Sequence, residues 1–315
     1  MQPSRYAFEL WSPAGTLLAD LTGMAGSRSI TLSRNAADDI SFDLDLDEFE
    51  QYCRDSNLIP SRVLVPNYTE VRVRRGKQYM AGGKILLVDP SVTPTKSTVT
   101  VKSKGFLQLF RRRFTVSTAG TESRIFDATE ATAIAWALIN ESQSQGPRWN
   151  FGITLGPNQA TVGPHDRTYA DDEIAQALIN LTQVQVSPFD FEFTPDKKFN
   201  TYASIGSRKP ELIFQYPGNI KSLRAPKDGT ITANHIRVLG SGSGTDASAR
   251  AARDDFDSQD NYGVYEEKLL ESSVTEIQTL NEHGDAELAA VGKPFMLPAL
   301  QLDGNVVPYV TDYQI

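Results

Sequence analysis

Cysteine and histidine, the residues that most often build redox and metal sites, are nearly absent from this sequence. Its 315 residues include one cysteine, Cys53, and three histidines, His165, His235 and His283. A single cysteine excludes an internal disulfide framework and leaves no second thiol for a cysteine-based metal site. The histidines stand in unrelated contexts, without the paired spacing of a zinc enzyme. We therefore expect no metal site and no cofactor.

Long apolar runs are also missing. No segment approaches the ~20 apolar residues that a transmembrane helix needs. The opening residues Met1–Phe8 lack the charged-then-apolar order of a signal peptide. These absences predict a protein without a membrane segment that is made in a reducing cytoplasm. We expect it to stay soluble until it joins an assembly.

Concentrated positive charge is the third missing feature. The formal net charge is −8, and the basic residues are dispersed except for the run Arg111, Arg112 and Arg113. A protein that reads duplex DNA normally presents a basic face, because phosphate neutralisation supplies much of its affinity. The charge balance therefore argues against specific DNA binding, but it is compatible with DNA passing nearby. We interpret the arginine run as a helix end that is solvated or paired with another subunit.

The sequence does have enough apolar content for a large core. With 40% hydrophobic residues over this length, two or three domains are expected rather than one. The N-terminal third has strand patterns at Tyr6–Trp11, Glu70–Arg74 and Gln78–Val88. Apolar and polar residues alternate strictly over Asp39–Leu46, which is typical of a strand with one buried and one solvated face. Gly105 begins a short amphipathic helix that runs to the arginines.

The middle of the chain changes character. Apolar residues recur at helical spacing over Thr129–Ser144 and again over Asp171–Val184. A hairpin follows, in which Phe189, Phe191 and Phe193 alternate before a turn at Pro195–Lys198. Residues 115–213 are therefore predicted to form an α+β unit.

Strand patterns return in the last third, at Ile213–Tyr216 and Asn234–Leu239. Gly240–Thr245 opens a Gly/Ser-rich and charged stretch, which we expect to be mobile on its own. A strand near Tyr265 and a helix around Thr275–Val291 are predicted next. Tyr309–Ile315 again has a strand-like pattern, so we expect the sequence to stop within a domain and leave that domain incomplete at its C-terminal end.

The acidic face of the alternating strand is the main candidate for a functional surface. Asp39, Asp43 and Asp45 point away from the predicted core, together with Ser41. If this face lines a channel, its negative charge keeps DNA from adhering during passage. The alternative is an ordinary solvated strand face, because alternation shows only that these residues are not core.

Two further patterns contain residue types that occur in catalytic or ligand sites. Asp171, Asp172 and Glu173 offer carboxylates for a hydrolase, but three consecutive acids before a helix are typical of caps and dipole partners. Gly240–Gly244 has the glycine content of a phosphate loop without the lysine and hydroxyl residue that follow one. We therefore nominate no catalytic and no cofactor-binding residues and predict that the protein is not an enzyme.

Seven segments, in their order along the chain, carry a resemblance to a known family. They are Ser29–Arg34, Ile40–Leu46, Met80–Ile85, Gly105–Arg113, Arg167–Tyr169, Phe214–Ile220 and Asp260–Gly263. These segments resemble the tail-hub family of long-tailed phages, which contains the baseplate hub of contractile tails and the N-terminal part of siphophage tail-tip proteins. Together they span nearly the whole chain.

The resemblance implies a mainly β fold with two tail-tube-like β-barrel domains and a small α+β domain between them. On this basis we expect a first barrel over residues 1–114 and an inserted α+β domain over residues 115–213. Strands over residues 214–245 are expected to return to the first barrel. A second β domain with a helix is expected over residues 246–315.

The resemblance also implies a function as a virion structural protein at the distal end of the tail. Three copies would form a homotrimer with pseudo-sixfold symmetry around the DNA channel. That ring would join the distal tail protein ring above to a central fibre or spike below, and the C-terminus of the tape-measure protein would occupy its channel before ejection. One alternative is the distal tail protein itself, a hexameric ring. Another is a tail-associated cell-wall hydrolase.

Overall fold

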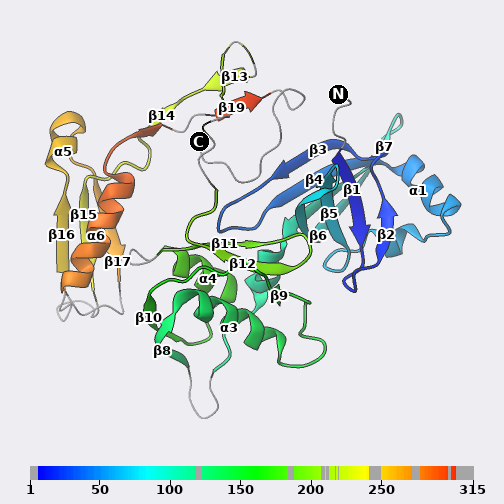
Figure 1. The fold of residues 1–315 in the computed structure, drawn as a ribbon. Coiled ribbons are helices and arrows are strands. Elements are labelled where there is room, and N and C mark those ends of the chain that lie inside the picture. Colours follow the sequence, from blue (N-terminus) through cyan, green and yellow to red (C-terminus); the bar gives the residue numbers. More distant parts are fainter. Residues whose placement is uncertain are drawn as a thin grey trace. The chain divides into compact units, whose positions relative to one another are not determined.

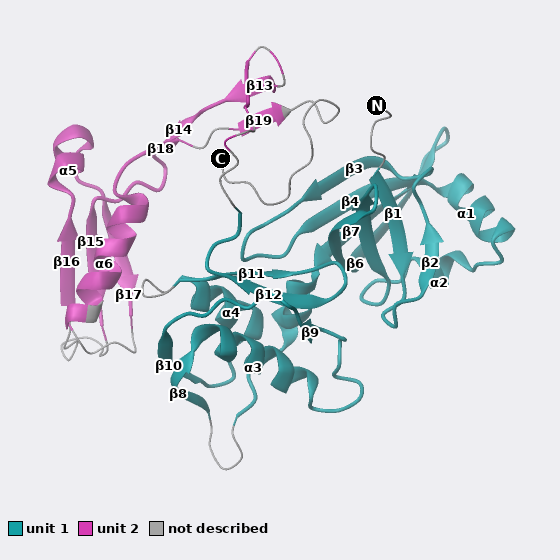
Figure 2. Cartoon of the chain, viewed as in Figure 1, with its two compact units in different colours: residues 1–208, 310–315 teal, residues 209–309 magenta. Residues whose placement is uncertain are grey.

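The computed structural model divides the chain into two units, residues 1–208 with 310–315 and residues 209–309 (Figure 2). Both units contain sheets and helices, and the chain as a whole is mainly β (Figure 1). The residues that the structure describes are 6–117, 123–183, 188–206, 210, 213–216, 218, 220–240, 250–271, 277–296 and 299–302.

The first unit begins with a sheet whose seven described strands pair in the order β2-β1-β5-β6-β7-β4-β3. Every pairing in it is antiparallel, and Figure 1 shows the sheet with helix α1 beside it. The strands are β1 (Tyr6–Trp11), β2 (Leu17–Asp20), β3 (Gly26–Thr31), β4 (Asp39–Asp45), β5 (Glu70–Arg75), β6 (Gln78–Val92) and β7 (Ser97–Gly105).

Alternation in the sequence explains how this sheet buries one face. On β4 the apolar residues Ile40, Phe42 and Leu44 are buried, whereas the residues between them are not. The Phe42 ring meets Phe8 of β1 edge-on, with ring centroids 5.3 Å apart. Burying each such side chain stabilises the fold by roughly 1.5–3 kcal/mol. Helices α1 (Leu46–Asp55) and α2 (Pro60–Val63) add buried side chains to this core, including Cys53 of α1.

The predicted closure of this sheet into a barrel remains a proposal. The two ends of the strand order are β2 and β3, which are consecutive in the chain. Among the described residues no hydrogen-bonded ladder joins these two strands, so the sheet is open along that line.

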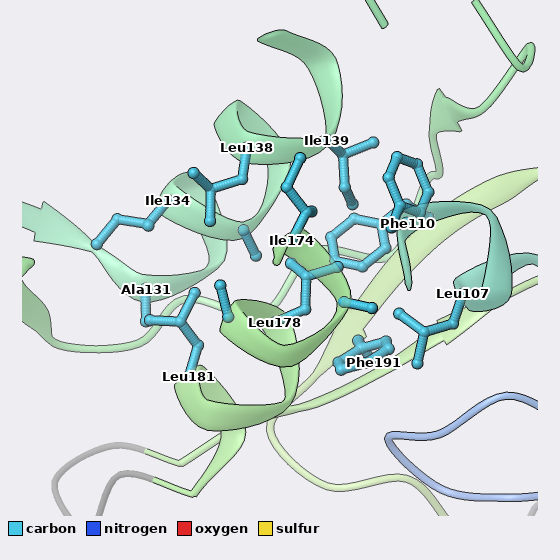
Figure 3. Packing of buried hydrophobic residues seen from close by; sticks show 14 of the residues in the cluster. Leu107, Phe110, Ala131, Ile134, Leu138, Ile139, Ile174, Leu178, Leu181 and Phe191 are labelled. Atoms are coloured by element: carbon cyan, nitrogen blue, oxygen red, sulfur yellow. The ribbon is translucent and has the colours of Figure 1, made fainter. Parts of the chain in front are cut away.

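An α+β part completes the first unit, and two helices form the centre of its core. Helices α3 (Ala131–Gln143) and α4 (Ile174–Thr182) direct Leu138 and Leu178 into a common apolar cluster (Figure 3). Phe110 joins them from the 3₁₀ helix η1 (Phe106–Arg112), which follows β7 directly. The strands of this part are β8 (Arg124–Glu130), β9 (Thr154–Leu155), β10 (Pro164–Tyr169), β11 (Asp190–Phe193) and β12 (Lys198–Tyr202).

Hairpin β11–β12 covers the same core with its phenylalanines. Phe191, Phe193 and Phe199 contact one another, with centroid separations of 5.2–6.0 Å. The helix and hairpin predictions for this region are therefore confirmed. Both helices are slightly shorter than expected, since α3 begins at Ala131 and α4 at Ile174.

The second unit contains a three-stranded sheet covered by a helix. Its strands pair in the order β16-β15-β17, and helix α6 places Leu280 and Val291 against Ile236 and Val238 of β15. A Cβ at Gly284 of α6 would lie 2.9–3.0 Å from side-chain atoms of Arg253 and Val238, so the helix approaches the sheet closely there. The elements are β15 (His235–Leu239), β16 (Arg250–Asp254), α5 (Phe256–Tyr262), β17 (Glu266–Leu270) and α6 (Ile277–Val291).

Two short strand pairs complete the second unit. Strand β13 (Ile220–Arg224) pairs with β19 (Ala299–Leu302), and β14 (Lys227–Asp228) pairs with β18 (Phe295–Met296). The described strands between residues 214 and 245 therefore pair with later parts of the chain, because their partners lie within the same unit. This pairing differs from the expected return of 214–245 to the first barrel, and the domain boundaries stay a prediction.

The remaining predictions for the last third of the chain concern a strand, a helix and two terminal or Gly/Ser-rich segments. The predicted strand at Ile213–Tyr216 is wrong, since these residues are described outside any strand and Ile213 is 73% exposed. The predicted helix near Thr275–Val291 is confirmed as α6 from Ile277 onward. Most of the Gly/Ser-rich stretch, residues 241–249, and the strand-like end at Tyr309–Ile315 lie outside the described residues.

Candidate functional site

The three acids predicted to line a channel lie in a row on β4, and each has a local partner. Asp39 Oδ1 is 2.7 Å from Nζ of Lys104. Asp43 accepts a hydrogen bond from the Thr100 hydroxyl at 2.7 Å. Asp45 caps helix α1, because its side chain accepts the backbone N–H groups of residues 47 and 48 at 3.1 Å each.

Basic residues of β7 balance the charge of this row. The register places Lys104 opposite Asp39 and Lys102 opposite Ser41. Opposite charges on facing strand positions stabilise a sheet by a few tenths to about 1 kcal/mol. The face is therefore mixed in charge rather than uniformly acidic. The signal was present in the sequence, because Ser97–Lys104 alternates in the same way as β4.

The channel-facing assignment of Asp39, Asp43 and Asp45 stays a prediction. Their positions on one face of one strand agree with the alternation that suggested it. All three carboxylates have partners within the first unit that need no channel, namely Lys104, the Thr100 hydroxyl and the N-terminus of α1.

A buried charge cluster lies on the other half of the sheet. Glu70 of β5 is fully buried, and its Oε1 lies 2.5 Å from Nζ of Lys197, whose side chain is 7% exposed. Nη2 of Arg72 is 3.5 Å from Oε2 of the same carboxylate. Lys84 of β6 stands opposite Glu70 in the strand register and is 9% exposed. This sheet position therefore holds three cations around one carboxylate.

Lys197 comes from the turn of hairpin β11–β12, so the cluster links the hairpin to the sheet. Its Nζ also donates to the carbonyl oxygens of Pro13 at 3.0 Å and Phe151 at 3.2 Å. The backbone of Lys197 has φ +65°, a left-handed conformation that costs free energy in a non-glycine residue. The three polar contacts of its ammonium, with Glu70 and the carbonyls of Pro13 and Phe151, offset that cost. We call this connection, carried by Glu70, Lys197, Gly82 and Pro195, the joint.

Gly82 of β6 is the close-packed part of the joint. A Cβ at this position would lie 2.7 Å from Cα of Pro195 and 3.2 Å from its carbonyl oxygen. Real Cβ atoms do not approach backbone so closely, which means that the hairpin turn can lie on the sheet here because residue 82 is glycine. The sequence carries a signal for this contact, because adjacent glycines inside a strand pattern indicate a bulge or a close backbone approach, and the structure shows a close approach.

A second contact fixes the same hairpin from the β3–β4 loop. The Asn35 side chain donates to Asp190 Oδ1 and accepts the backbone N–H of Phe191, both at 2.8 Å. Asp190 also accepts the N–H of Ile205 at 2.8 Å. Asn35 adopts φ +54°, a left-handed conformation that asparagine tolerates better than most residues. The Asn35 side chain therefore binds β11 by accepting a backbone N–H, as the carbonyl of a neighbouring strand would.

Asp38, in this loop, provides a pH-dependent prediction. Burial raises the pKa of Asp38 to about 6, the N–H of Ser33 lowers it, and the charges of Glu192 and Asp39 raise it again. A carboxyl whose pKa is higher in the folded state than its unfolded value of 3.8 stabilises the fold at low pH. That contribution is lost as pH rises through about 6. Between pH 4 and pH 7 we expect the free energy of unfolding of the Asp38→Asn variant to exceed that of the parent increasingly, by on the order of 2 kcal/mol.

Chemical unfolding at a series of pH values measures this effect. Asp196→Asn is the control of opposite sign. Burial raises the pKa of Asp196, but hydrogen bonds from Lys198 and Thr194 outweigh burial, so the pKa is lowered overall. Its lowered pKa stabilises the fold above the unfolded value, so this variant should lose stability relative to the parent as pH rises. Parallel curves for Asp38→Asn and the parent would contradict the assignment.

The candidate catalytic and metal residues are placed in structural contacts. Asp172 accepts the N–H of Ala170 at 2.9 Å, and Glu173 forms an ion pair with Arg111 at 3.3 Å. His235 lies 2.7 Å from Asp254 on the neighbouring strand β16, and His283 lies 2.9 Å from Glu271. Within the described ranges, no group of three or more His, Cys, Asp or Glu side chains could hold a metal ion.

The arginine run ends η1 and has aromatic partners. The Arg113 guanidinium lies 4.3 Å from the ring centroid of Trp149 and 4.6 Å from that of Phe151. Such cation–π contacts contribute about 0.5–2 kcal/mol. The prediction of a helix end is confirmed, and the partners within this chain are Glu173, Trp149 and Phe151.

In the described part of the chain, no helix is long and apolar enough to cross a membrane.

Solved structures share this fold at low sequence identity. No family model and no curated protein sequence matches the chain. The fold is similar to that of tail proteins in three solved structures, two of which come from prophages. The 43 kDa tail protein of prophage MuSo2 from Shewanella oneidensis has a TM-score of 0.55 and 13% identity, over 100% of this chain and 83% of its own.

Two further structures have the same TM-score to this chain. A tail protein from Neisseria meningitidis MC58 has a TM-score of 0.55 and 12% identity, over 90% of this chain and 76% of its own. Prophage tail protein gp18 from Listeria monocytogenes EGD-e has a TM-score of 0.55 and 9% identity, over 93% of this chain and 80% of its own. Likeness at this level of identity establishes the fold alone.

Proposed function

We propose that this chain is a structural protein of a phage tail, and that it forms the tail-tip hub. Three copies form a ring with pseudo-sixfold symmetry around the DNA channel. The ring connects the tail tube and distal tail protein ring to a central fibre or spike. The C-terminus of the tape-measure protein occupies its channel before DNA is ejected, and DNA later passes without specific binding.

One observation carries the proposal, namely the extent of the fold likeness. The three tail proteins are similar to this chain over 90–100% of its length, so the likeness includes both units rather than one common sheet. The order of the sequence segments that resemble tail hubs provides independent support. Two closed tail-tube-like barrels and the domain boundaries at residues 114, 213 and 245 belong to this proposal.

The proposed mechanism is assembly, so it assigns no catalytic residue. Large side chains around α5 are exposed, with Phe256 at 70% and Val264 at 63%, and Tyr262 and Tyr265 at 50% and 53%. In the proposed ring, contacts with neighbouring proteins cover these side chains, since exposed apolar surface often marks an interaction site. Ring closure would also cover strand edges such as β2, β3 and β17.

Native mass spectrometry of the purified chain tests the ring. We expect a species of three times the 34.7 kDa of one chain. A species of six times that mass would favour the distal tail protein over the hub. Release of soluble fragments from purified cell walls, abolished by Asp171→Asn or Asp172→Asn, would contradict the non-enzymatic proposal and favour the tail-associated hydrolase.

A further inference from the structure

A cavity of about 280 Å³ lies next to the buried charge cluster in the first unit. It is lined by Pro13, Lys84, Asn150, Phe151 and Gly152. Its volume exceeds the ~30 Å³ that one water molecule occupies in the liquid, so it has room for a small polyatomic ligand. Of the side chains that line it, Lys84 is the charged one.

The surroundings of this cavity carry an excess of positive charge. Glu70 is the carboxylate of the cluster, and Lys197 and Arg72 contact it directly. Lys84 is a third cation, and Arg113 lies 4.6 Å from the ring centroid of Phe151 in the cavity wall. A buried charge without a counterion costs several kcal/mol. The charge balance of this region therefore favours an anion.

Lys84 has hydrogen-bond capacity to spare. Its residue is more than nine-tenths buried, and among the described residues its ammonium donates one hydrogen bond, to the Asn67 carbonyl at 3.4 Å. A lysine ammonium has three N–H donors. Burial lowers the pKa of Lys84, Glu70 raises it and Lys197 lowers it again. Arg72 Nε is likewise buried without a hydrogen-bond partner in the described part of the chain.

We propose that the cavity beside Lys84 is an anion site that takes a single oxyanion. Lys84 supplies the charge and hydrogen bonds, and the carboxamide of Asn150 is a further donor in the lining. The occupant is a carboxylate from an acidic side chain of a binding partner or a free inorganic oxyanion. Its charge offsets the excess around Glu70 and holds the sheet and the 150–152 segment together. This inference does not depend on the tail-tip assignment.

Thermal unfolding with added oxyanion tests the site in the full chain. Sodium acetate and sodium phosphate are titrated separately at constant ionic strength, balanced with sodium chloride. We expect saturating oxyanion to raise the Tm of the parent by about 2–4 °C, because a ligand that binds the folded state stabilises it. Lys84→Met should abolish the rise. Lys102→Met, which removes an exposed lysine on β7, should retain it.

The two ligands distinguish the possible sources of the anion. A rise in Tm with acetate assigns the site to a side-chain carboxylate, and a rise in Tm with phosphate alone assigns it to an inorganic ion. Isothermal titration calorimetry of the parent provides a readout that needs no variant, should Lys84→Met fail to fold. The absence of a one-site isotherm with both ligands would overturn the proposal, as would equal Tm shifts in the parent and Lys84→Met.

Discussion

Replacing Lys197 by methionine should lower the free energy of unfolding by about 3–5 kcal/mol, the range found when one partner of a buried ion pair is removed. The methionine keeps most of the apolar length of the side chain. It removes the ammonium that contacts Glu70 and the carbonyls of Pro13 and Phe151. A fully buried carboxylate would then retain Arg72 at 3.5 Å as its nearest ion-pair partner. Urea unfolding monitored by tryptophan fluorescence measures the loss.

The adjacent lysine is a matched control for this prediction. Lys198 forms an ion pair with Asp196 in which the side chains are 46% and 51% exposed. Exposed pairs contribute roughly 0–1 kcal/mol, so Lys198→Met should change stability little. Combining Lys197→Met with Glu70→Gln should recover part of the loss, because the uncompensated charge is gone. Similar losses for Lys197→Met and Lys198→Met would contradict the account of the joint.

Replacing Gly82 by alanine should cost about 2–3 kcal/mol, near the upper end of the usual cost of overpacking. The added methyl would lie 2.7 Å from the backbone of Pro195, and backbone cannot move aside as a flexible side chain can. The hairpin turn must therefore withdraw from the sheet and lengthen the contact between Lys197 and Glu70. Differential scanning calorimetry measures the loss of stability.

Two further measurements make the Gly82 prediction specific to the joint. Hydrogen exchange should become faster in hairpin β11–β12 while β1 and β4 keep their protection, since their core is untouched. Gly23→Ala is the control, because a Cβ at Gly23 has no heavy atom within 4 Å. Equal Tm values for the Gly82→Ala and Gly23→Ala variants would show that the close approach at Pro195 does not constrain the hairpin.

Elements with a strong local pattern could be predicted from the sequence. Strand β4 follows strict alternation, and helices α3 and α4 follow helical spacing, so each carries its own signal. Strands β8 and β10 lack such a signal, because they pair with each other and leave much of both strands exposed. Strand β9 has two residues and depends on a parallel partner far along the chain.

The joint could not be predicted from the sequence, because its ion pair connects residues that lie far apart in the chain. Nothing near Glu70 or Lys197 indicates that the two residues meet. The sequence predicts the turn at Pro195–Lys198, but turn chemistry favours exposed lysines rather than one lysine buried against a sheet. The Gly82–Gly83 pair indicates a bulge or a close approach without identifying the partner. Contacts of this kind depend on tertiary packing, which local patterns do not encode.

The low identity to the solved tail proteins is compatible with a shared fold. A core tolerates extensive replacement when the apolar pattern and total volume are kept. In this chain the pattern is maintained by alternating positions on strands such as β4 and by helical spacing on α3 and α4. Identity of 9–13% can therefore coexist with similarity over nearly the entire chain.

A cryo-electron-microscopy reconstruction of the phage tail tip, with no symmetry imposed at first, tests the central claim most directly. The account predicts a threefold ring around an axial channel, with two barrels from each copy and with Asp39, Asp43 and Asp45 facing the lumen. A sixfold ring with one barrel per copy would contradict it and identify a distal tail protein. A chain that lies off the axis, or that is absent from the tail, would contradict the structural role altogether.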